Sequence, residues 1–196
     1  AEVSWVEADL GQPAQAAQVI EQAVAQDGLD TLIYNLGIWE EQAFDEAYSF
    51  LKDEDTQLEA IVSCNITAPL LLIKRLLPVL LKSPNPRIIF TGSTSGLPQS
   101  GRPEVTFGAS KFALRGMADA LREGYRHQRL GVTCLNLGYL NTEDPLSTSR
   151  LEAEQRGDGQ LIPVHDVVQV VRMALSLSSA SFVKELTLPA LLDERF

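Results

Sequence analysis

Cysteine and histidine are both scarce in this chain of 196 residues, which contains two of each. Two cysteines, Cys64 and Cys134, cannot hold together a disulfide-rich scaffold, and their scarcity favours a reducing compartment, the cytoplasm. The two histidines, His127 and His165, belong to no cysteine or histidine cluster. Because a zinc site needs several such ligands, the sequence predicts no metal site.

An excess of basic residues is also absent. Lysine and arginine total 16 against 26 aspartates and glutamates, which gives a formal net charge of −10. Proteins that bind nucleic acid neutralise its phosphates with basic side chains, and anionic membrane surfaces attract the same charges. The acidic balance therefore predicts neither nucleic acid nor a membrane as a partner.

Long uninterrupted hydrophobic runs are missing as well. The most apolar stretch, residues 61–81, is interrupted by Asn65, Lys74, Arg75 and two prolines. A membrane span needs about 20 mostly uncharged residues, so this stretch is predicted to be a buried or half-buried helix. With 45% hydrophobic and 21% charged residues, the chain has the composition of a globular protein, and residues 1–196 are predicted to form a single domain.

Strand-like and helix-like segments alternate along the chain. The expected strands are residues 3–8, 29–34, 87–91, 131–137 and 184–188, and the expected helices are residues 14–26, 56–82, 107–126 and 165–178. Strands separated by helices of ten or more residues predict right-handed crossovers and a parallel sheet, so the fold class is α/β. Within the long second helix, Pro69 and Pro78 are expected to bend or split it.

Polar residues follow several of these strands. Asp9, Asn35, Ser93 and residues 136–142 stand at the predicted carboxyl ends, where open parallel sheets bind ligands. Residues 138–160 are predicted to be a long polar loop that covers a substrate, and the Gly-Asp-Gly sequence at 157–159 suggests mobility.

Six short motifs carry a more specific signal through their order and spacing. They are YNLG (34–37), Asn65, IIFTGSTSG (88–96), FGASK (107–111), LGYLNT (137–142) and VKELTL (183–188). Over residues 3–188 the chain thereby resembles the short-chain dehydrogenase/reductase family. The resemblance implies a Rossmann-type, doubly wound parallel sheet in three αβα layers. It also implies NAD or NADP as cofactor, a small carbonyl or alcohol substrate, and a homodimer or homotetramer formed through the two long helices.

The resemblance assigns roles to individual residues. The family's four catalytic positions fall on Asn65, Ser93, Phe107 and Lys111. Serine orients the substrate oxygen, lysine holds the ribose and lowers the pKa of a tyrosine four residues earlier, and asparagine helps to hold a water beside the lysine. Cofactor contacts are implied for residues at the strand ends, namely Asp9, Asn35, Gly37, Lys111, Gly138 and Thr142.

Phe107 departs from the family pattern, because the family has tyrosine at this position. A phenyl ring can neither donate nor accept a proton, and loss of general acid–base help costs about 10²- to 10⁴-fold in rate. The phenylalanine is either native or an engineered change. Two further departures, Leu36 and Leu137 in place of the family's alanine and proline, bear on the cofactor contacts.

Plainer interpretations of the same residues remain open. Ser93 fits a turn residue bonded to its own backbone, Lys111 a solvated helix residue, Asn65 a side chain bonded across a helix kink, and Asp9 a helix-start residue. Two functions follow: an NAD(P)-dependent oxidoreductase impaired by Phe107, or a catalytically inactive relative that serves as a binding or regulatory protein. A hydrolase is disfavoured, because the GSTSG sequence has Thr94 where a nucleophile elbow needs serine.

The family's glycine-rich turn between its first strand and first helix has no counterpart in this sequence. Matching Asp9 to the end of the family's third strand leaves about fifty residues, the first βαβ segment, outside the chain. The chain is therefore expected to be incomplete at its start, through truncation or disorder. Residues 3–8 are then expected to lack a hydrogen-bonding neighbour, and the choice between NAD and NADP cannot be read.

Overall fold

Four parallel strands form the central sheet of the computed structural model, which describes residues 2–25 and 27–194. They are β1 (Thr31–Tyr34), β2 (Arg87–Ser93), β3 (Gly131–Leu137) and β6 (Glu185–Leu188), in the spatial order β1-β2-β3-β6. All three strand pairs are parallel, and the register pairs Phe90 with Tyr34 on one side and with Cys134 on the other. The expected α/β parallel sheet is confirmed.

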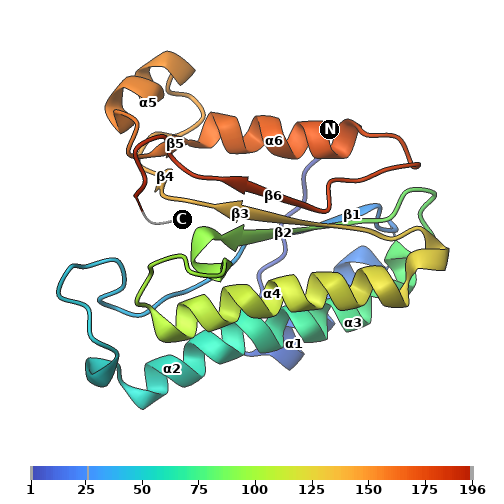
Figure 1. Cartoon of the computed structure of the whole chain (residues 1–196). Coiled ribbons are helices and arrows are strands. Elements are labelled where there is room, and N and C mark those ends of the chain that lie inside the picture. The colour runs from blue at the N-terminus through green and yellow to red at the C-terminus, as the bar shows by residue number, and fades with distance from the viewer. Residues whose placement is uncertain (1, 26, 195–196) are drawn as a thin grey trace.

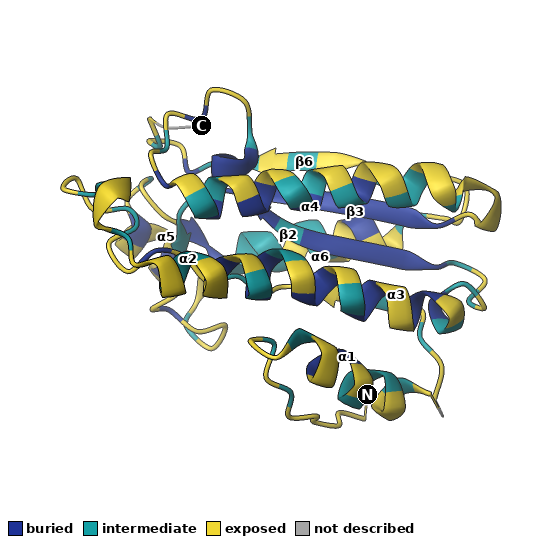
Figure 2. Cartoon of the chain, turned by 90° about the horizontal axis from the view of Figure 1, so that it is seen from below, coloured by how far each residue is buried: buried dark blue, intermediate teal, exposed yellow. Residues whose placement is uncertain are grey.

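Helices cover both faces of this sheet and give three layers (Figure 1). Three helices, α1 (Pro13–Val24), α3 (Ala68–Leu80) and α4 (Val105–Gly124), lie on one side, and α6 (Val164–Ser176) lies on the other. Helices α3 and α4 turn their buried residues toward the strands, α1 packs against α3, and the outer faces of these helices are largely exposed (Figure 2). The αβα layering that the family resemblance implies is therefore confirmed.

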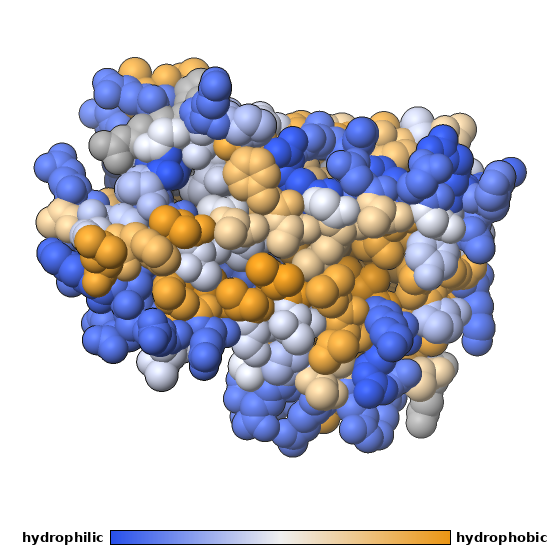
Figure 3. All heavy atoms as spheres, turned by 60° about the horizontal axis from the view of Figure 1, so that its bottom comes forward, coloured by the Kyte–Doolittle hydropathy of each residue, from blue (hydrophilic) through white to orange (hydrophobic). Residues whose placement is uncertain are grey.

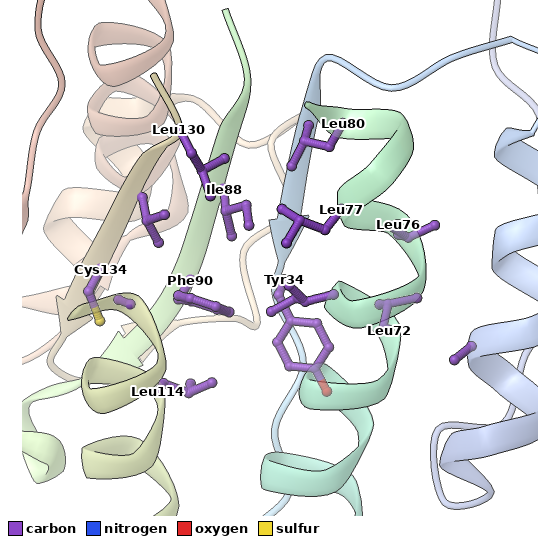
Figure 4. Close-up of a cluster of buried hydrophobic side chains, with 14 residues drawn as sticks. Tyr34, Leu72, Leu76, Leu77, Leu80, Ile88, Phe90, Leu114, Leu130 and Cys134 are labelled. Carbon is purple, nitrogen blue, oxygen red and sulfur yellow. The ribbon is translucent and has the colours of Figure 1, made fainter. Parts of the chain in front are cut away.

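Apolar side chains from α3, α4 and the central strands form the main core (Figure 4). Leu76 and Leu80 of α3 and Ile88 and Phe90 of β2 belong to this cluster, and each of the four is at most 1% exposed. Full burial of such a side chain stabilises the fold by about 1.5–3 kcal/mol. This packing holds the carboxyl ends of β1, β2 and β3 at one edge of the molecule.

The long helix is continuous but changes its pitch in the middle. It runs as α2 (Asp55–Val62), a π-helical segment (Ser63–Thr67) and α3, and the amide of Ala68 donates to the carbonyl of Ser63. Pro69 follows directly and has no amide proton to donate, so the widened turn lies where an α-helical bond is missing. Pro78 lies inside α3 without ending it.

This helix, Asp55–Leu80, is the one helix within the described ranges that is long and apolar enough to span a membrane by length and composition. Half of its most apolar window is buried inside the fold, against the sheet and its neighbouring helices. Core helices of globular proteins pass the same test. The structure thus shows the half-buried helix that the sequence predicts.

The strand expected at residues 3–8 does not form. Residues 2–9 take no regular secondary structure, and Val3 and Trp5 are 71% and 92% exposed. A strand is stabilised by hydrogen bonds to a neighbour, and none of the described strands lies beside this segment. Apolar alternation alone is therefore insufficient, and the prediction of a strand here is wrong.

Residues 138–160 are more ordered than a polar loop. Strand β4 (Leu140–Asn141) pairs in parallel with β5 (Ile162–Pro163), and helix α5 (Arg150–Gly157) lies between them. The Ser149 side chain caps α5 by accepting from the amide of Glu152, and Arg156 pairs with Asp144. The Gly-Asp-Gly sequence ends α5, with Asp158 and Gly159 in the left-handed region at φ 43° and 73°.

Candidate active site

A cavity of about 350 Å³ opens at the carboxyl ends of β1, β2 and β3. Its walls come from the segments that follow these strands and from the first turns of α4. Seven of the residues singled out in the sequence line it, namely Asn35, Gly37, Ser93, Phe107, Lys111, Gly138 and Thr142. Asn65 lies behind the cavity wall, and Asp9 lies elsewhere.

Lys111 is the most unusual residue of this cavity. Its side chain is buried, with 6% of the residue exposed, and its Nζ donates to the carbonyl of Thr91 at 3.1 Å. The same nitrogen lies 5.3 Å from the centre of the Phe107 ring. Burial lowers the pKa of Lys111 to about 8, and the nearby Cys134 opposes this shift. A solvated helix lysine, the plainer expectation, is not what the structure shows.

Gly37 makes room for this amine. A β-carbon built at Gly37 would lie 3.0 Å from Lys111 Nζ, which is closer than real β-carbons normally approach a nitrogen. Gly96 makes room for the start of this residue, because a β-carbon there would lie 2.9 Å from Lys111 Cβ and 3.0 Å from its backbone carbonyl carbon. Gly37 of YNLG and Gly96 of GSTSG thus allow α4 and its lysine to approach the strand ends closely.

Asn65 fastens the segment that follows β1. Its Oδ1 accepts from the amide of Ile38 at 2.9 Å, and its Nδ2 donates to the carbonyl of Ile38 at 2.7 Å and to Ser110 Oγ at 3.0 Å. The π-helical segment carries Asn65 inward, where it is 2% exposed. Single π-turns recur at functional sites, and this one joins the long helix, the β1 loop and α4.

Ser93 makes the backbone contact of a turn serine and also lines the cavity. It ends β2 and lines the cavity, and its Oγ accepts from the amide of Ser95 at 3.1 Å to cap a short 3-10 helix, Thr94–Gly96. Among the hydrogen bonds of the described residues, none uses the Ser93 hydroxyl proton. The hydroxyl is therefore able to donate to a ligand in the cavity.

Phe107 stands between Lys111 and a cluster of aromatic rings. The Phe107 ring lies 6.2 Å from Trp39 and 5.6 Å from Phe44, and Phe44 lies 5.6 Å from Tyr139, all in edge-to-face arrangements. Such contacts stabilise by about 0.5–1.5 kcal/mol beyond the buried area. One wall of the cavity is consequently aromatic, and it has no titrating group at position 107.

Glu40 fixes the start of α4 and was not anticipated from the sequence. The residue is fully buried, and its Oε1 accepts from the amides of Thr106 at 2.8 Å and Phe107 at 3.0 Å. Glu40 precedes α4 by more than sixty residues, so no capping signature in the local sequence reveals the contact. A carboxylate at the N-terminus of a helix interacts favourably with the helix dipole. The hydrogen bond from its amide to Glu40 also holds Phe107 in place.

Arg102 forms a second contact that sequence reasoning missed. Its Nη2 donates to both carboxylate oxygens of Asp193 at 3.0 Å, and its Nη1 donates to the Tyr139 hydroxyl at 2.8 Å. The side chains of Arg102 and Asp193 are 5% and 3% exposed. This ion pair joins the carboxyl-terminal segment to the cavity wall.

Asp9 is the one predicted cofactor residue that stands apart. It is exposed, its Oδ1 accepts from the amide of Gly11 at 2.9 Å, and its carbonyl accepts from Gln12 just before α1. The structure therefore places Asp9 in a helix-start turn and not on the cavity. Within residues 2–25 and 27–194, no group of three or more His, Cys, Asp or Glu side chains could hold a metal ion.

The cavity walls fit one end of a nicotinamide nucleotide. A buried ammonium, the space kept by Gly37 and the backbone at Gly138 suit a ribose and a flat ring, and the volume is at the small end of ligand sites. The described residues include no glycine-rich strand-to-helix turn for a pyrophosphate. Chemically, the site offers a hydroxyl donor and an amine, and no acid or base at position 107.

Comparison with known proteins gives consistent relatives. The family described as short chain dehydrogenase matches residues 1–152. The uncharacterized oxidoreductase YciK of Escherichia coli K12 is 33% identical over 143 residues, which cover 72% of this chain and 53% of that protein. The chain spans about half the length of the curated relatives it matches first.

Solved structures share the fold. A blue fluorescent protein from a metagenomic library, in complex with NADPH, is 25% identical with a TM-score of 0.72, covering 94% of this chain and 73% of that chain. A 4-hydroxyisoleucine dehydrogenase complexed with NADH is 19% identical with a TM-score of 0.74, covering 94% and 77%. The second likeness bears on the fold alone.

Proposed function

The chain belongs to the short-chain dehydrogenase family, and on that premise we propose that it is an NAD(P)-dependent oxidoreductase that interconverts a carbonyl and an alcohol, with proton transfer impaired. The observation that carries this proposal is one cavity lined by Ser93, Lys111 and Phe107. Ser93 and Lys111 are the residues that the family has at these positions, whereas Phe107 lacks the hydroxyl group of the family's tyrosine.

Residues around Lys111 would hold the cofactor. The Lys111 ammonium would bind the ribose hydroxyls, Asn35 and Gly37 would form the wall beside it, and Gly138 and Thr142 would face the nicotinamide end. The similar protein solved in complex with NADPH supports this choice of cofactor. Asn65 would act indirectly, by holding the β1 loop against α4.

Substrate activation would rest on Ser93. Its hydroxyl would donate to the substrate oxygen and polarise the carbonyl, and the aromatic wall would exclude water from the reacting atoms. A bound nicotinamide supplies or accepts the hydride. Phe107 can supply no proton, so the developing alkoxide must take its proton from a slower source, such as water.

A second candidate function is a binding or regulatory protein that has lost the chemistry. Phe107 favours it directly, and Leu36 adds to it, because the Leu36 side chain fills part of the cavity wall where the family has alanine. Both functions predict that a ligand binds in the cavity, but only the oxidoreductase predicts turnover of a substrate.

We also propose assembly through the long helices. Apolar side chains gather between α3 and α4 on one face of the molecule (Figure 3). Leu70 on α3 and Phe112 on α4 are 49% and 42% exposed. A homodimer or homotetramer would cover these side chains. The free, buried Cys64 and Cys134 are consistent with the cytoplasm as its compartment.

Cofactor binding is the first test. In a Trp5→Phe background, Trp39 is the remaining tryptophan and borders the cavity, so its fluorescence reports binding there. Titration with NADH and with NADPH is expected to give saturable energy transfer to the reduced nicotinamide for at least one of them. Lys111→Met is expected to weaken it by about 10- to 100-fold, the contribution of a charged hydrogen bond. Absence of saturable binding of either cofactor would overturn the proposal.

The space kept by Gly37 gives a second prediction. Gly37→Ala places a β-carbon against Lys111 Nζ and is expected to weaken the same cofactor about tenfold, because the amine must move. Gly116→Ala is the matched control, since a β-carbon there meets nothing within 4 Å. Both affinities are measured by the same titration, and equal affinities in the two variants would contradict the role of Gly37.

A further inference from the structure

The amine of Lys111 lines a cavity without a carboxylate beside it. Among the ion pairs of the described residues none involves Lys111, and its Nζ bonds only to the Thr91 carbonyl. A buried ammonium with no counter-ion is costly, so burial favours the neutral, nucleophilic form.

The other four lysines of the chain differ from Lys111 in their exposure to solvent. Lys52, Lys74, Lys82 and Lys184 are all exposed to solvent. Water stabilises the charged form of an exposed amine, and burial removes that stabilisation at pH 7.5. Lys111, with a pKa of about 8, is about one quarter neutral at that pH. Lys111 is thus the one buried lysine of the chain, and the other four are exposed.

The cavity wall beside this amine is aromatic. The Phe107 ring lies 5.3 Å from Nζ, and Trp39 continues the wall toward solvent, with 53% of its surface exposed. A planar aryl group that stacks along these rings brings a substituent on its edge toward Nζ. Ser93 on the same wall has a hydroxyl proton free to bond an oxygen.

We propose that Lys111 forms imines with aromatic aldehydes that enter this cavity. This activity requires no cofactor and is separate from the hydride transfer discussed above. The preferred partner is an aldehyde carried on one aryl ring, because the wall is aromatic and the cavity holds about 350 Å³.

The reaction balances without a redox step. The neutral Nζ adds to the carbonyl carbon, the C=O electron pair moves to oxygen, and oxygen takes a proton to give a carbinolamine. The nitrogen lone pair then expels the hydroxyl as water and forms the C=N bond. One amine and one aldehyde thereby give one imine and one water, and the Ser93 hydroxyl stabilises the oxygen during the addition.

The titratable and charged groups near Lys111 allow the pH dependence of imine formation to follow the titration of the Lys111 amine. Cys134 on β3 is the titratable neighbour of the amine, and burial raises the pKa of Cys134 to about 11, above the pH range in which Lys111 titrates. Arg102 lines the same cavity but is paired with Asp193. Imine formation at Lys111 is therefore expected to rise with pH to a midpoint near 8.

The test uses the native chain with benzaldehyde and sodium cyanoborohydride, which reduces an imine to a stable benzylamine. Peptide mapping by mass spectrometry compares labelling at Lys111 with that at the four exposed lysines in the same sample. At pH 7.5 we expect labelling at Lys111 to be at least about tenfold faster, since its larger neutral fraction outweighs the lower intrinsic nucleophilicity of a weaker base. Labelling that is equal at all lysines, or slower at Lys111, would overturn the proposal.

Two matched comparisons separate the cavity from simple amine reactivity. Trp39→Ala is expected to slow benzaldehyde labelling of Lys111 several-fold and to leave acetaldehyde labelling of Lys111 unchanged, because only the aryl group uses the aromatic wall. Equal slowing with both aldehydes would contradict the aromatic preference. Saturating NADPH is expected to protect Lys111 if it binds there, whereas labelling without protection would leave imine formation standing and count against the cofactor site.

Discussion

Replacing Phe107 by tyrosine is expected to raise the turnover of a carbonyl substrate by about 10²- to 10⁴-fold, with little change in cofactor affinity. Phe107 lines the cavity, and its ring centre lies 5.3 Å from Lys111 Nζ. A hydroxyl added to this ring would enter the cavity beside the ammonium, whose charge lowers a phenol pKa. The measurement is NADPH oxidation with acetophenone, followed by the loss of reduced-nicotinamide absorbance.

Two controls make this result specific to proton transfer. Phe107→Leu changes the ring without adding an acid and is expected to leave turnover low. Phe107→Tyr combined with Lys111→Met restores the hydroxyl without its ammonium and is expected to lose most of the gain. A rise in turnover with Phe107→Leu, or no rise with Phe107→Tyr, would show that position 107 is not the missing proton donor.

Replacing Arg102 by methionine is expected to lower the free energy of unfolding by about 3–5 kcal/mol. The Arg102 and Asp193 side chains are 5% and 3% exposed, so the substitution leaves the Asp193 carboxylate buried without its arginine. Arg102 also donates to the Tyr139 hydroxyl and lies 4.3 Å above its ring centre. The substitution is therefore expected to destabilise the cavity wall as well as the carboxyl-terminal segment.

Urea denaturation of a double-mutant cycle tests this expectation. Arg102→Met with Asp193→Leu removes both charges and is expected to recover most of the stability lost by the single substitution, because no charge is left buried. If the double variant is no more stable than Arg102→Met, the cost comes from lost packing and not from the loss of the Arg102–Asp193 ion pair.

The part of the site that the sequence predicts consists of residues that are close in sequence and that lie near the carboxyl ends of strands. Ser93 and Phe107 are fourteen residues apart, and Lys111 follows Phe107 by one helical turn. Once the strand and helix are recognised, this spacing brings all three to one edge of a parallel sheet. The structure gathers them on one cavity for that reason.

The missed features are all long-range. Glu40 bonds to amides of residues 106 and 107, and Arg102 meets a residue 91 positions later. No local pattern marks such pairs, because each member looks like an ordinary surface charge in its own segment. The prediction for residues 3–8 is wrong for the opposite reason. Their local pattern is that of a strand, but none of the described strands pairs with them.

Helix α5 shows a third reason for disagreement. Its sequence, RLEAEQRG, has few apolar residues and thus little periodicity, so a polar loop is the natural expectation. The helix instead depends on the Ser149 cap and on ion pairs of Arg156 with Asp144 and Glu152. Such polar contacts stabilise a helix without leaving a hydrophobic stripe.

The central claim is that this cavity binds a nicotinamide cofactor and that Phe107 removes only the proton transfer. One parallel measurement tests it most directly: the dissociation constant of NADPH and the rate of acetophenone reduction, determined together for the native chain and for Phe107→Tyr. Equal dissociation constants within about twofold, with a turnover at least about 10²-fold higher in the variant, are predicted. Equal turnover despite equal binding, or no binding in either protein, would contradict the claim.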